Sequence, residues 1–222
     1  MIDGASQVVT SIDEHPKRRG RFVVTVGEEA VATVTVDTIS DLQLRIGSAL
    51  PTRVIDALRV QDRRTWLLDR ALRLLAVRAR SFVELSRTLQ KAKDRPQPDD
   101  VQWVLNALTE KGYLDDARFA EQFVRDRAAA RGWGKQRLTR ELRRRGVAQT
   151  HIDPAMTQAG DEATLDDARS AHAVALKWRR THSARDAQRD RQRLYGFLAR
   201  RGFAPDVIRD AMRAVLAHDE SE

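Results

Sequence analysis

Apolar residues recur at helical spacing along most of the chain. Leu138 and Leu142 stand four residues apart in one such stretch, and Leu194 and Leu198 do so in another. Side chains three or four residues apart lie on one face of an α-helix, so each stretch predicts an amphipathic helix with one buried face. Further stretches of the same spacing predict helix throughout the segment from Thr65 to Ala217.

One stretch occurs twice in nearly the same form. The segment from Arg137 to Val147 returns without a gap as the segment from Arg193 to Phe203, with the same leucine spacing and the same basic residues before a glycine. A weaker third copy lies upstream, where Leu85 and Leu89 occupy the two leucine positions. Such self-similarity indicates one supersecondary unit used more than once, and each copy has the pattern of three short helices.

The first sixty residues follow a different pattern. Val and Thr alternate with polar residues there, which predicts a small antiparallel sheet of two or three strands, and we expect no strand elsewhere in the chain. Two short helices are expected after the sheet. The predicted strands are Val8–Ile12, Arg21–Val26 and Ala30–Val36, and the predicted helices are Ile39–Arg45 and Pro51–Val60.

Together these patterns predict a mainly α protein, built of three tandem three-helix repeats and preceded by a small β-rich N-terminal extension. We assign residues 1–60 to the extension with its short helices, and residues 61–116, 117–160 and 161–222 to the three repeats. Proteins built in this way usually offer an extended surface to a partner, whereas a small substrate needs a pocket.

Helix ends are marked by polar residues and glycines. Ser81 and Glu84 have the spacing of a capping box and predict the start of a helix. Gly146 and Gly202 each follow a helical run that ends in arginines, which is typical of a helix C-terminus. These arginines are therefore open to two interpretations, as helix-capping cations or as binding residues, and one does not exclude the other.

Composition narrows the class of protein. The chain has 222 residues and no cysteine, so it has neither disulfides nor a thiolate metal site. No apolar run is long enough to span a bilayer, and the N-terminus lacks the layout of a signal peptide. Charged residues make up 32% of the chain and aromatic residues only 5%, which favours elongated helices with thin cores. We expect a cytoplasmic monomer that does not bind membranes.

The net charge of +8 is unevenly distributed. Residues 1–65 are balanced, whereas residues 117–160 hold ten basic and four acidic residues and residues 169–213 hold twelve and four. Acidic stretches at residues 161–167 and 219–222 partly offset this excess. A basic field on the bodies of the second and third repeats would attract phosphates or an acidic protein surface.

Basic residues on the predicted second helix of each repeat are the strongest binding candidates. Arg137, Arg140 and Arg144 stand three or four residues apart, which predicts one stripe that faces away from Leu138 and Leu142. A solvated arginine-rich face with no partner would have the same pattern. The residues that we expect to contact DNA or an acidic partner are Arg131, Lys135, Arg137, Arg140, Arg143, Arg144, Arg145, Arg193, Arg200 and Arg201.

The sequence lacks the usual signatures of catalysis. Gly132–Lys135 does not have the spacing of a phosphate-binding loop, and the five histidines are scattered, so we expect neither a cofactor nor a metal. Asp115–Asp116 and Asp166–Asp167 resemble paired carboxylates, but both pairs stand where helix N-termini favour negative charge. No serine or threonine has the setting of a nucleophile. We therefore expect a protein that is not an enzyme.

These residues carry a family resemblance. A Gly-Tyr-Leu-Asp-Asp-x-Arg-Phe-Ala block and a later Leu-x-x-Arg-Gly-Phe block are specific when they occur together, and the chain resembles the RecX family of bacterial regulatory proteins from about residue 66 onward. The residues that carry the resemblance are Arg80–Leu85, Leu108–Ala120, Gly134, Arg137–Leu138, Glu141–Gly146 and Phe197–Phe203.

The resemblance implies a helical array that docks in the groove of the RecA–DNA filament. Proteins of this kind limit the recombinase, ATPase and co-protease activities of RecA, so the implied partners are RecA and single- or double-stranded DNA. Two alternatives remain open from the residues themselves. The chain could be an autonomous DNA-binding protein with a helix-turn-helix at Leu138–Met156, or an adaptor that binds only protein. Salt dependence of binding would separate them.

Overall fold

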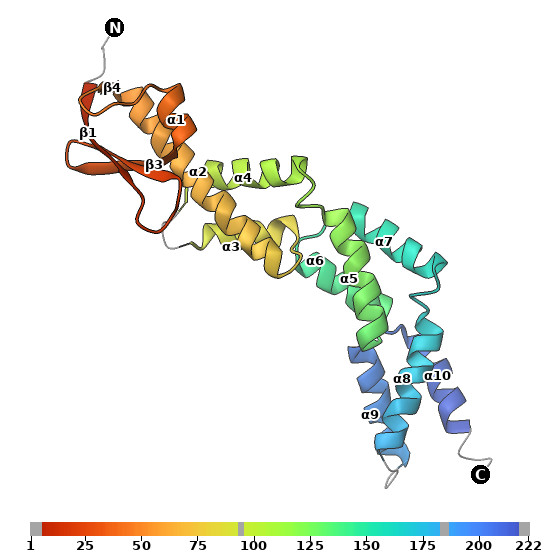
Figure 1. The fold of residues 1–222 in the computed structure, drawn as a ribbon. Coiled ribbons are helices and arrows are strands. Elements are labelled where there is room, and N and C mark those ends of the chain that lie inside the picture. The colour runs from red at the N-terminus through yellow and green to blue at the C-terminus, as the bar shows by residue number, and fades with distance from the viewer. Residues whose placement is uncertain (1–5, 93–95, 183–186, 218–222) are drawn as a thin grey trace. The chain divides into compact units, whose positions relative to one another are not determined.

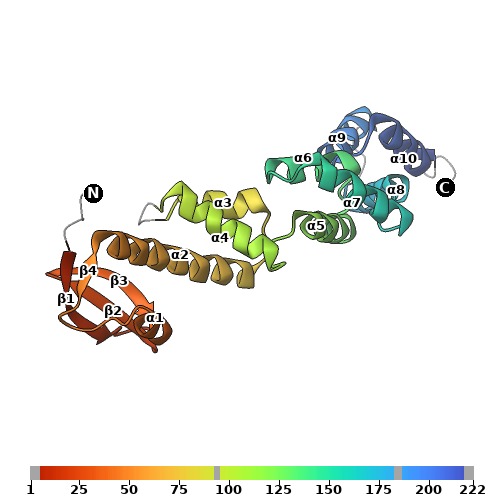
Figure 2. The same ribbon diagram turned by 90° about the horizontal axis from the view of Figure 1, so that it is seen from above.

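The structure is a computed structural model that describes residues 6–92, 96–182 and 187–217, and the statements below concern these ranges. The expected acidic stretch at residues 219–222 lies outside them. The chain forms two compact units (Figures 1 and 2). One unit consists of Met1–Arg78 and Ser86–Glu110, and the other consists of Ala79–Leu85 and Lys111–Glu222.

The first unit begins with an antiparallel sheet in the order β3-β2-β1-β4. Its strands are β1 (Ser6–Glu14), β2 (Arg21–Val26), β3 (Glu29–Thr35) and β4 (Ala49–Pro51). The three predicted strands are confirmed, but the expectation that no other strand exists was wrong. β4 pairs with the start of β1 through Ser6, Gln7 and Val8. A strand of three residues is too short to show an alternating pattern, so this strand could not be predicted from residue spacing.

The helices of the first unit differ from the prediction in two respects, and the first is that the helix predicted at Ile39–Arg45 lies at Val36–Asp41. They are α1 (Val36–Asp41), α2 (Thr52–Val77) and α4 (Pro98–Glu110), and α3 (Phe82–Gln90) is divided between the two units. The short helix predicted at Pro51–Val60 and the first helix of the first repeat are one helix, α2. No glycine or proline interrupts this segment, so nothing stops the helix at residue 60. The assigned boundary between residues 60 and 61 therefore falls inside a helix.

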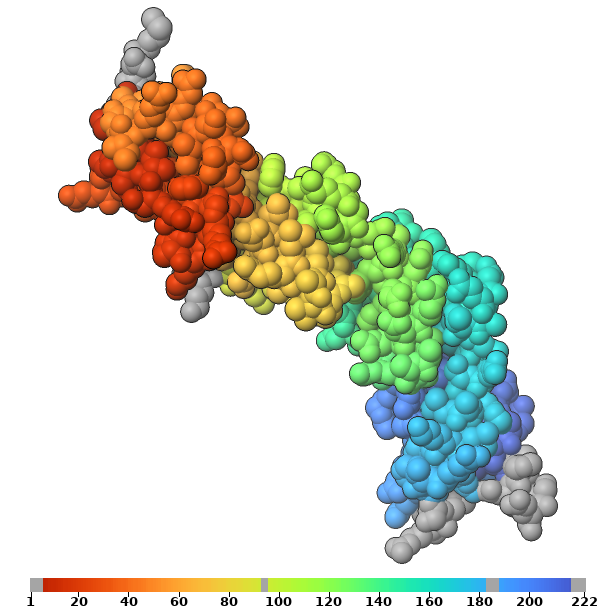
Figure 3. All heavy atoms as spheres, viewed as in Figure 1, coloured from red at the N-terminus to blue at the C-terminus, as the bar shows by residue number. Residues whose placement is uncertain are grey.

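The sheet is covered by the start of α2, which gives this unit a core of its own. Val24 and Val34 from the sheet are buried against Ile55 and Leu58 from α2. The sheet, α1 and the first turns of α2 form one closely packed lobe, red and orange in Figure 3. A sheet of this size is marginal by itself, and the apolar face of α2 completes its core.

The second unit contains two complete three-helix repeats. The first comprises α5 (Asp116–Arg131), α6 (Lys135–Arg144) and α7 (Gln149–Asp161), and the second comprises α8 (Asp167–Thr181), α9 (Ala187–Arg200) and α10 (Pro205–Ala217). Leu138 and Leu142 are fully buried in one core, and Leu194 and Leu198 are at most 1% exposed in the other. The repeat alignment is confirmed, and the protein is mainly α with a small N-terminal sheet. None of the described helices has the length and apolar character required to cross a membrane.

Candidate nucleic-acid interface

The outer face of α6 is an exposed arginine surface. Arg140, Arg143 and Arg144 are exposed, and they lie opposite Leu138 and Leu142, which are both 0% exposed. Because the two leucines anchor the helix in its core, the arginines must point to solvent. This set of three arginines is called the α6 face below.

The three arginines of the α6 face differ in how firmly they are held. Arg144 forms an ion pair with Glu141 at 2.8 Å, one turn away, and Arg143 Nε donates to Gln149 Oε1 at 2.9 Å. No hydrogen bond or ion pair to a described residue holds Arg140. Exposed pairs of this kind contribute little to folding.

Arg145 and Arg137 do not belong to this exposed surface. Arg145 forms an ion pair with Glu84, and their side chains are only 24% and 18% exposed. The guanidinium of Arg145 also lies 5.1 Å from the centre of the Phe123 ring. Arg137, which the spacing had placed in one stripe with Arg140 and Arg144, is half-buried instead. Arg137 lies on the flank of α6 and Arg145 directly follows its last residue, and residues of other helices contact both.

The contacts of Arg145 form part of a joint at the start of α3, which we call the first joint. Here the Ser81 hydroxyl donates to the Arg145 carbonyl, and the Phe82 backbone N–H donates to the Asp116 carboxylate at 2.7 Å. Burial raises the pKa of Asp116, and the bond from Phe82 acts against that rise. Gly146 has a φ of +80°, and a Cβ at this position would lie 2.4 Å from Val83, so only glycine permits this close approach.

A second joint at the start of α6 repeats this arrangement. The Gly134 N–H donates to the Arg201 carbonyl at 2.9 Å, and the Gln136 N–H donates to the Gly202 carbonyl at 3.2 Å. The Lys135 N–H donates to the Asp167 carboxylate at 3.2 Å, and burial raises the pKa of this carboxyl too. The repeat alignment places Lys135, Asp167 and Gly202 where the first joint has Phe82, Asp116 and Gly146.

The two joints differ in charge. Arg201 of the second joint occupies the position of Arg145 in the first joint. Arg137 occupies the position of Glu84, so a cation replaces an anion there. Arg137 donates to the Arg200 carbonyl at 3.0 Å and lies 4.1 Å from the centre of the Trp133 ring, and Arg201 donates to the Arg131 carbonyl. Burial lowers the pKa of Arg201, and the neighbouring positive charge of Arg137 lowers it further. The second joint therefore holds two cations where the first holds an ion pair.

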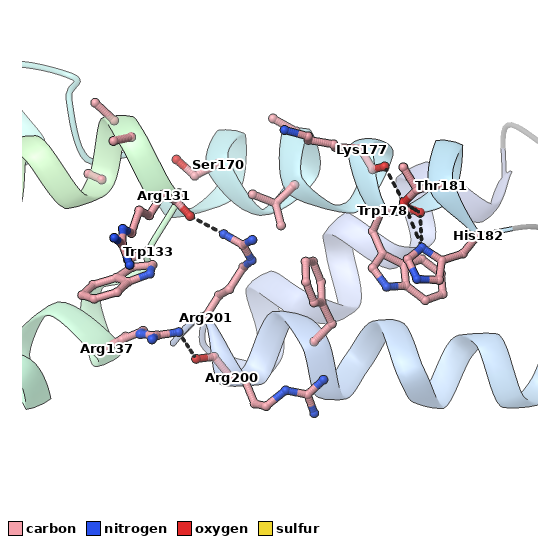
Figure 4. Close-up of a pocket in the computed structure, with 17 residues that line it drawn as sticks. Arg131, Trp133, Arg137, Ser170, Lys177, Trp178, Thr181, His182, Arg200 and Arg201 are labelled. Atoms are coloured by element: carbon pink, nitrogen blue, oxygen red, sulfur yellow. Dashed lines mark hydrogen bonds between the residues drawn. The ribbon is translucent and has the colours of Figure 1, made fainter.

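These two arginines line a cleft of about 880 Å³ between the two repeats of the second unit (Figure 4). The described residues of the cleft wall include five cationic side chains and no carboxylate. Trp133, Trp178 and Phe197 supply aromatic walls. The cationic residues are Arg131, Arg137, Lys177, Arg200 and Arg201. Such a lining favours an anion with some apolar character.

The remaining predicted binding residues lie around this cleft or near it. Arg131 and Arg200 are exposed and belong to its lining, and Lys135 is exposed at the start of α6. Arg193 is 71% exposed and approaches Asp190 to 4.0 Å on its own helix. The structure thus divides the ten candidates into exposed cations and three that are half-buried in the joints, which are Arg137, Arg145 and Arg201.

Lys177 and the aspartate of each joint were missed by sequence reasoning. Lys177 has no counterpart in the repeated Leu-x-x-x-Leu segment, so the self-similarity did not point to it. The aspartates could have been found from the two Asp-Asp pairs, because only one residue of each pair is needed to cap its helix. The first residue of each pair caps its own helix, since Asp115 accepts from the Arg118 N–H and Asp166 from the Arg169 N–H, each at 3.0 Å. The second residue reaches the helix of the preceding repeat.

The arrangement defines a class of protein: a helical-repeat protein with arginines on its surface and in its inter-repeat cleft. Within the described residues, no three His, Cys, Asp or Glu side chains are grouped so that they could hold a metal ion. The profile of the second three-helix domain of RecX matches residues 115–156, and that of the third matches residues 166–212.

Relatives and solved structures agree with these matches. The chain is 41% identical over 154 residues to the regulatory protein RecX of Mycolicibacterium vanbaalenii, which covers 67% of this chain and 81% of the relative. It is also 42% identical over 153 residues to the regulatory protein RecX of Halorhodospira halophila. This match covers 68% of this chain and 89% of that relative. A crystal structure of a regulatory protein RecX superposes with a TM-score of 0.67 at 22% identity, covering 92% of this chain and 99% of the other. The chain belongs to the RecX family of regulatory proteins.

Proposed function

We propose that this protein regulates RecA by binding the RecA nucleoprotein filament, without catalysing a reaction. Binding would limit the recombinase, ATPase and co-protease activities of RecA, and so act on DNA recombination, repair and the SOS response. Membership of the RecX family carries this proposal. The α6 face and the cationic cleft are the surfaces of the described chain best suited to the phosphates of the filament.

The α6 face has the rigidity that such contacts need. Leu138 and Leu142 fix the helix in its core, and the second joint fixes its first turn through backbone hydrogen bonds from Gly134 and Gln136. Arginines on a rigid helix lose less conformational freedom on binding than arginines on a loop. Contacts to phosphates from such a face would be independent of DNA sequence.

The alternative of an autonomous helix-turn-helix reader has less support. In that arrangement α7 would be the recognition helix that follows α6. Its sequence, Gln149–Asp161, contains no Lys or Arg, and it carries Asp153 and Asp161. Gln149, a residue type that could read a base, is held by Arg143 and donates to Asp153. A helix with this charge is poorly suited to enter a DNA groove.

The test is a double charge reversal on the α6 face, Arg140→Glu with Arg143→Glu. We expect it to abolish inhibition of RecA-catalysed strand exchange and to flatten the salt dependence of filament binding, because phosphate contacts release counterions. Arg144 is left intact because its reversal would break the ion pair with Glu141. Circular dichroism and thermal unfolding would confirm that the variant folds.

The matched control is Arg53→Glu with Arg73→Glu on α2. Both residues are exposed, lie in the first unit and have no hydrogen bond or ion pair to a described residue. Arg59 is unsuitable because it forms an ion pair with Glu29 at 2.8 Å and so ties α2 to the sheet. Equal loss of inhibition in both double variants would show that general charge, and not the α6 face, is responsible.

A further inference from the structure

The two joints of the second unit have the same backbone contacts but opposite charge at one position. In the first joint the guanidinium of Arg145 meets the carboxylate of Glu84. In the second joint the residue at the Glu84 position is Arg137, so within the described residues Arg201 faces an arginine where Arg145 faces a carboxylate. The first joint can therefore serve as a reference for the second, because the equivalent arginine in the first joint faces a carboxylate.

The second joint also forms part of a cleft wall. Arg137 and Arg201 line the cleft of about 880 Å³, and Arg131, Lys177 and Arg200 join them in its wall. Arg137 uses one N–H for the Arg200 carbonyl, and Arg201 uses one for the Arg131 carbonyl. A guanidinium has five N–H donors, so most of the donors of both residues are left for a ligand.

We propose that this inter-repeat cleft is a binding site for phosphate groups, which supply the anion that Glu84 supplies in the first joint. Two features favour phosphate over a carboxylate. Two guanidiniums and a lysine together match a group with several acceptor oxygens and more than one negative charge. Arg137 is also held in place by the Trp133 ring and the Arg200 carbonyl, so its donors are oriented before a ligand arrives.

The phosphates could come from a nucleic-acid strand or from a free polyphosphate. The proposal deepens the proposed function by naming the group that the cleft recognises, but its test uses the full chain without RecA. If the cleft does not bind phosphate, the proposal that the α6 face binds the RecA filament still stands. If the RecA assay fails, the proposal for the cleft still stands.

The test is a titration of the protein with oligo(dT) and, separately, with pyrophosphate, followed by tryptophan fluorescence. Two of the four tryptophans, Trp133 and Trp178, line the cleft, so a bound ligand should change the emission. We expect saturable changes with both probes if the cleft takes phosphate in general, and with oligo(dT) alone if it needs a strand. No change with either probe would overturn the proposal.

The variant for this test is Lys177→Glu with Arg200→Glu. Both side chains are exposed and make no hydrogen bond or ion pair to a described residue, so their reversal leaves the joint intact. The dissociation constant for the bound probe should rise about tenfold or more, because two charge-assisted contacts are lost. The control Arg169→Glu with Arg209→Glu changes the charge equally, on exposed residues outside the cleft. Equal weakening in the two variants would overturn the proposal.

A second variant, Arg137→Glu, gives the second joint the charge arrangement of the first. The readout is the rise in melting temperature on addition of pyrophosphate, because the substitution also removes the contacts of Arg137 with Trp133 and Arg200 and changes stability directly. We expect the wild-type protein to show a rise that the variant lacks. A rise of the same size in both proteins would contradict a site that depends on Arg137.

Discussion

The first and second joints of the second unit are built alike and charged differently. In each, an aspartate at the start of a helix accepts a backbone N–H from the preceding repeat, and a glycine with positive φ permits close approach. The first joint then closes with the Glu84–Arg145 ion pair, and the second leaves Arg137 beside Arg201. The backbone contacts thus set the geometry of a joint, which leaves its side-chain charges free to serve a different purpose.

The glycines should show the largest effect, because they control the approach of the repeats. In Gly202→Ala the new Cβ would lie 2.3 Å from the backbone nitrogen of Arg137 at a φ of +86°. We expect a loss of roughly 2–5 kcal/mol in the free energy of unfolding, from the left-handed backbone and the overlap together. Urea unfolding followed by circular dichroism would measure it.

Gly112→Ala is the matched control for this substitution. Gly112 has a similar φ of +71° but nothing within 4 Å of a Cβ, so it should cost only about 1–2 kcal/mol. Gly146→Ala should fall close to Gly202→Ala, since its Cβ would lie 2.4 Å from Val83. If all three variants lost the same stability, the close approach at the joints would play no part.

An intermediate effect is expected from the arginines that distinguish the joints. Arg145→Met removes the ion pair with Glu84, whose side chain is only 18% exposed, and should cost roughly 1–3 kcal/mol. Arg201→Met loses a bond to a carbonyl but also removes repulsion from Arg137, so it should cost about 1 kcal/mol or less. Thermal unfolding of both variants would measure the difference. A larger cost at Arg201 would mean that the like-charged pair is not an unfavourable feature of the second joint.

Much of the fold followed from the sequence, because a single face of each helix is buried. The leucines that recur at Leu138, Leu142, Leu194 and Leu198 are buried as their spacing predicts. The errors arose where no local signal marks the outcome. The helix α2 continues past residue 60 because nothing in the sequence ends it, and β4 is a three-residue strand that only its pairing with β1 defines.

The candidate site was less predictable, for a geometric reason. Arg140 lies directly opposite the buried leucines, so any packing of α6 leaves it exposed. Arg137 lies on the flank of the same helix and Arg145 at its C-terminal end, and whether either is covered depends on residues from other repeats. The spacing of residues within one helix carries no information about those neighbours. The alignment of the repeats could have shown that Arg137 takes the place of Glu84, but only the structure shows that this position faces the next repeat.

The smallest effect concerns the feature that the joints share. Burial raises the pKa of Asp116 and of Asp167 above the ordinary value of 3.8, so the folded protein holds these protons more tightly than the unfolded chain does. The free energy of unfolding should therefore fall as the pH rises from 3.8 through the folded-state pKa of each group. In Asp116→Asn and Asp167→Asn this contribution disappears, while the amide oxygen still accepts the N–H of Phe82 or Lys135. The stability of each variant relative to wild type should thus increase with pH across that interval. Urea unfolding at a series of pH values would measure it. If the two variants change equally, the two joints differ in the charge around their arginines and not in their aspartates. A relative stability that does not change with pH would refute the role assigned to burial.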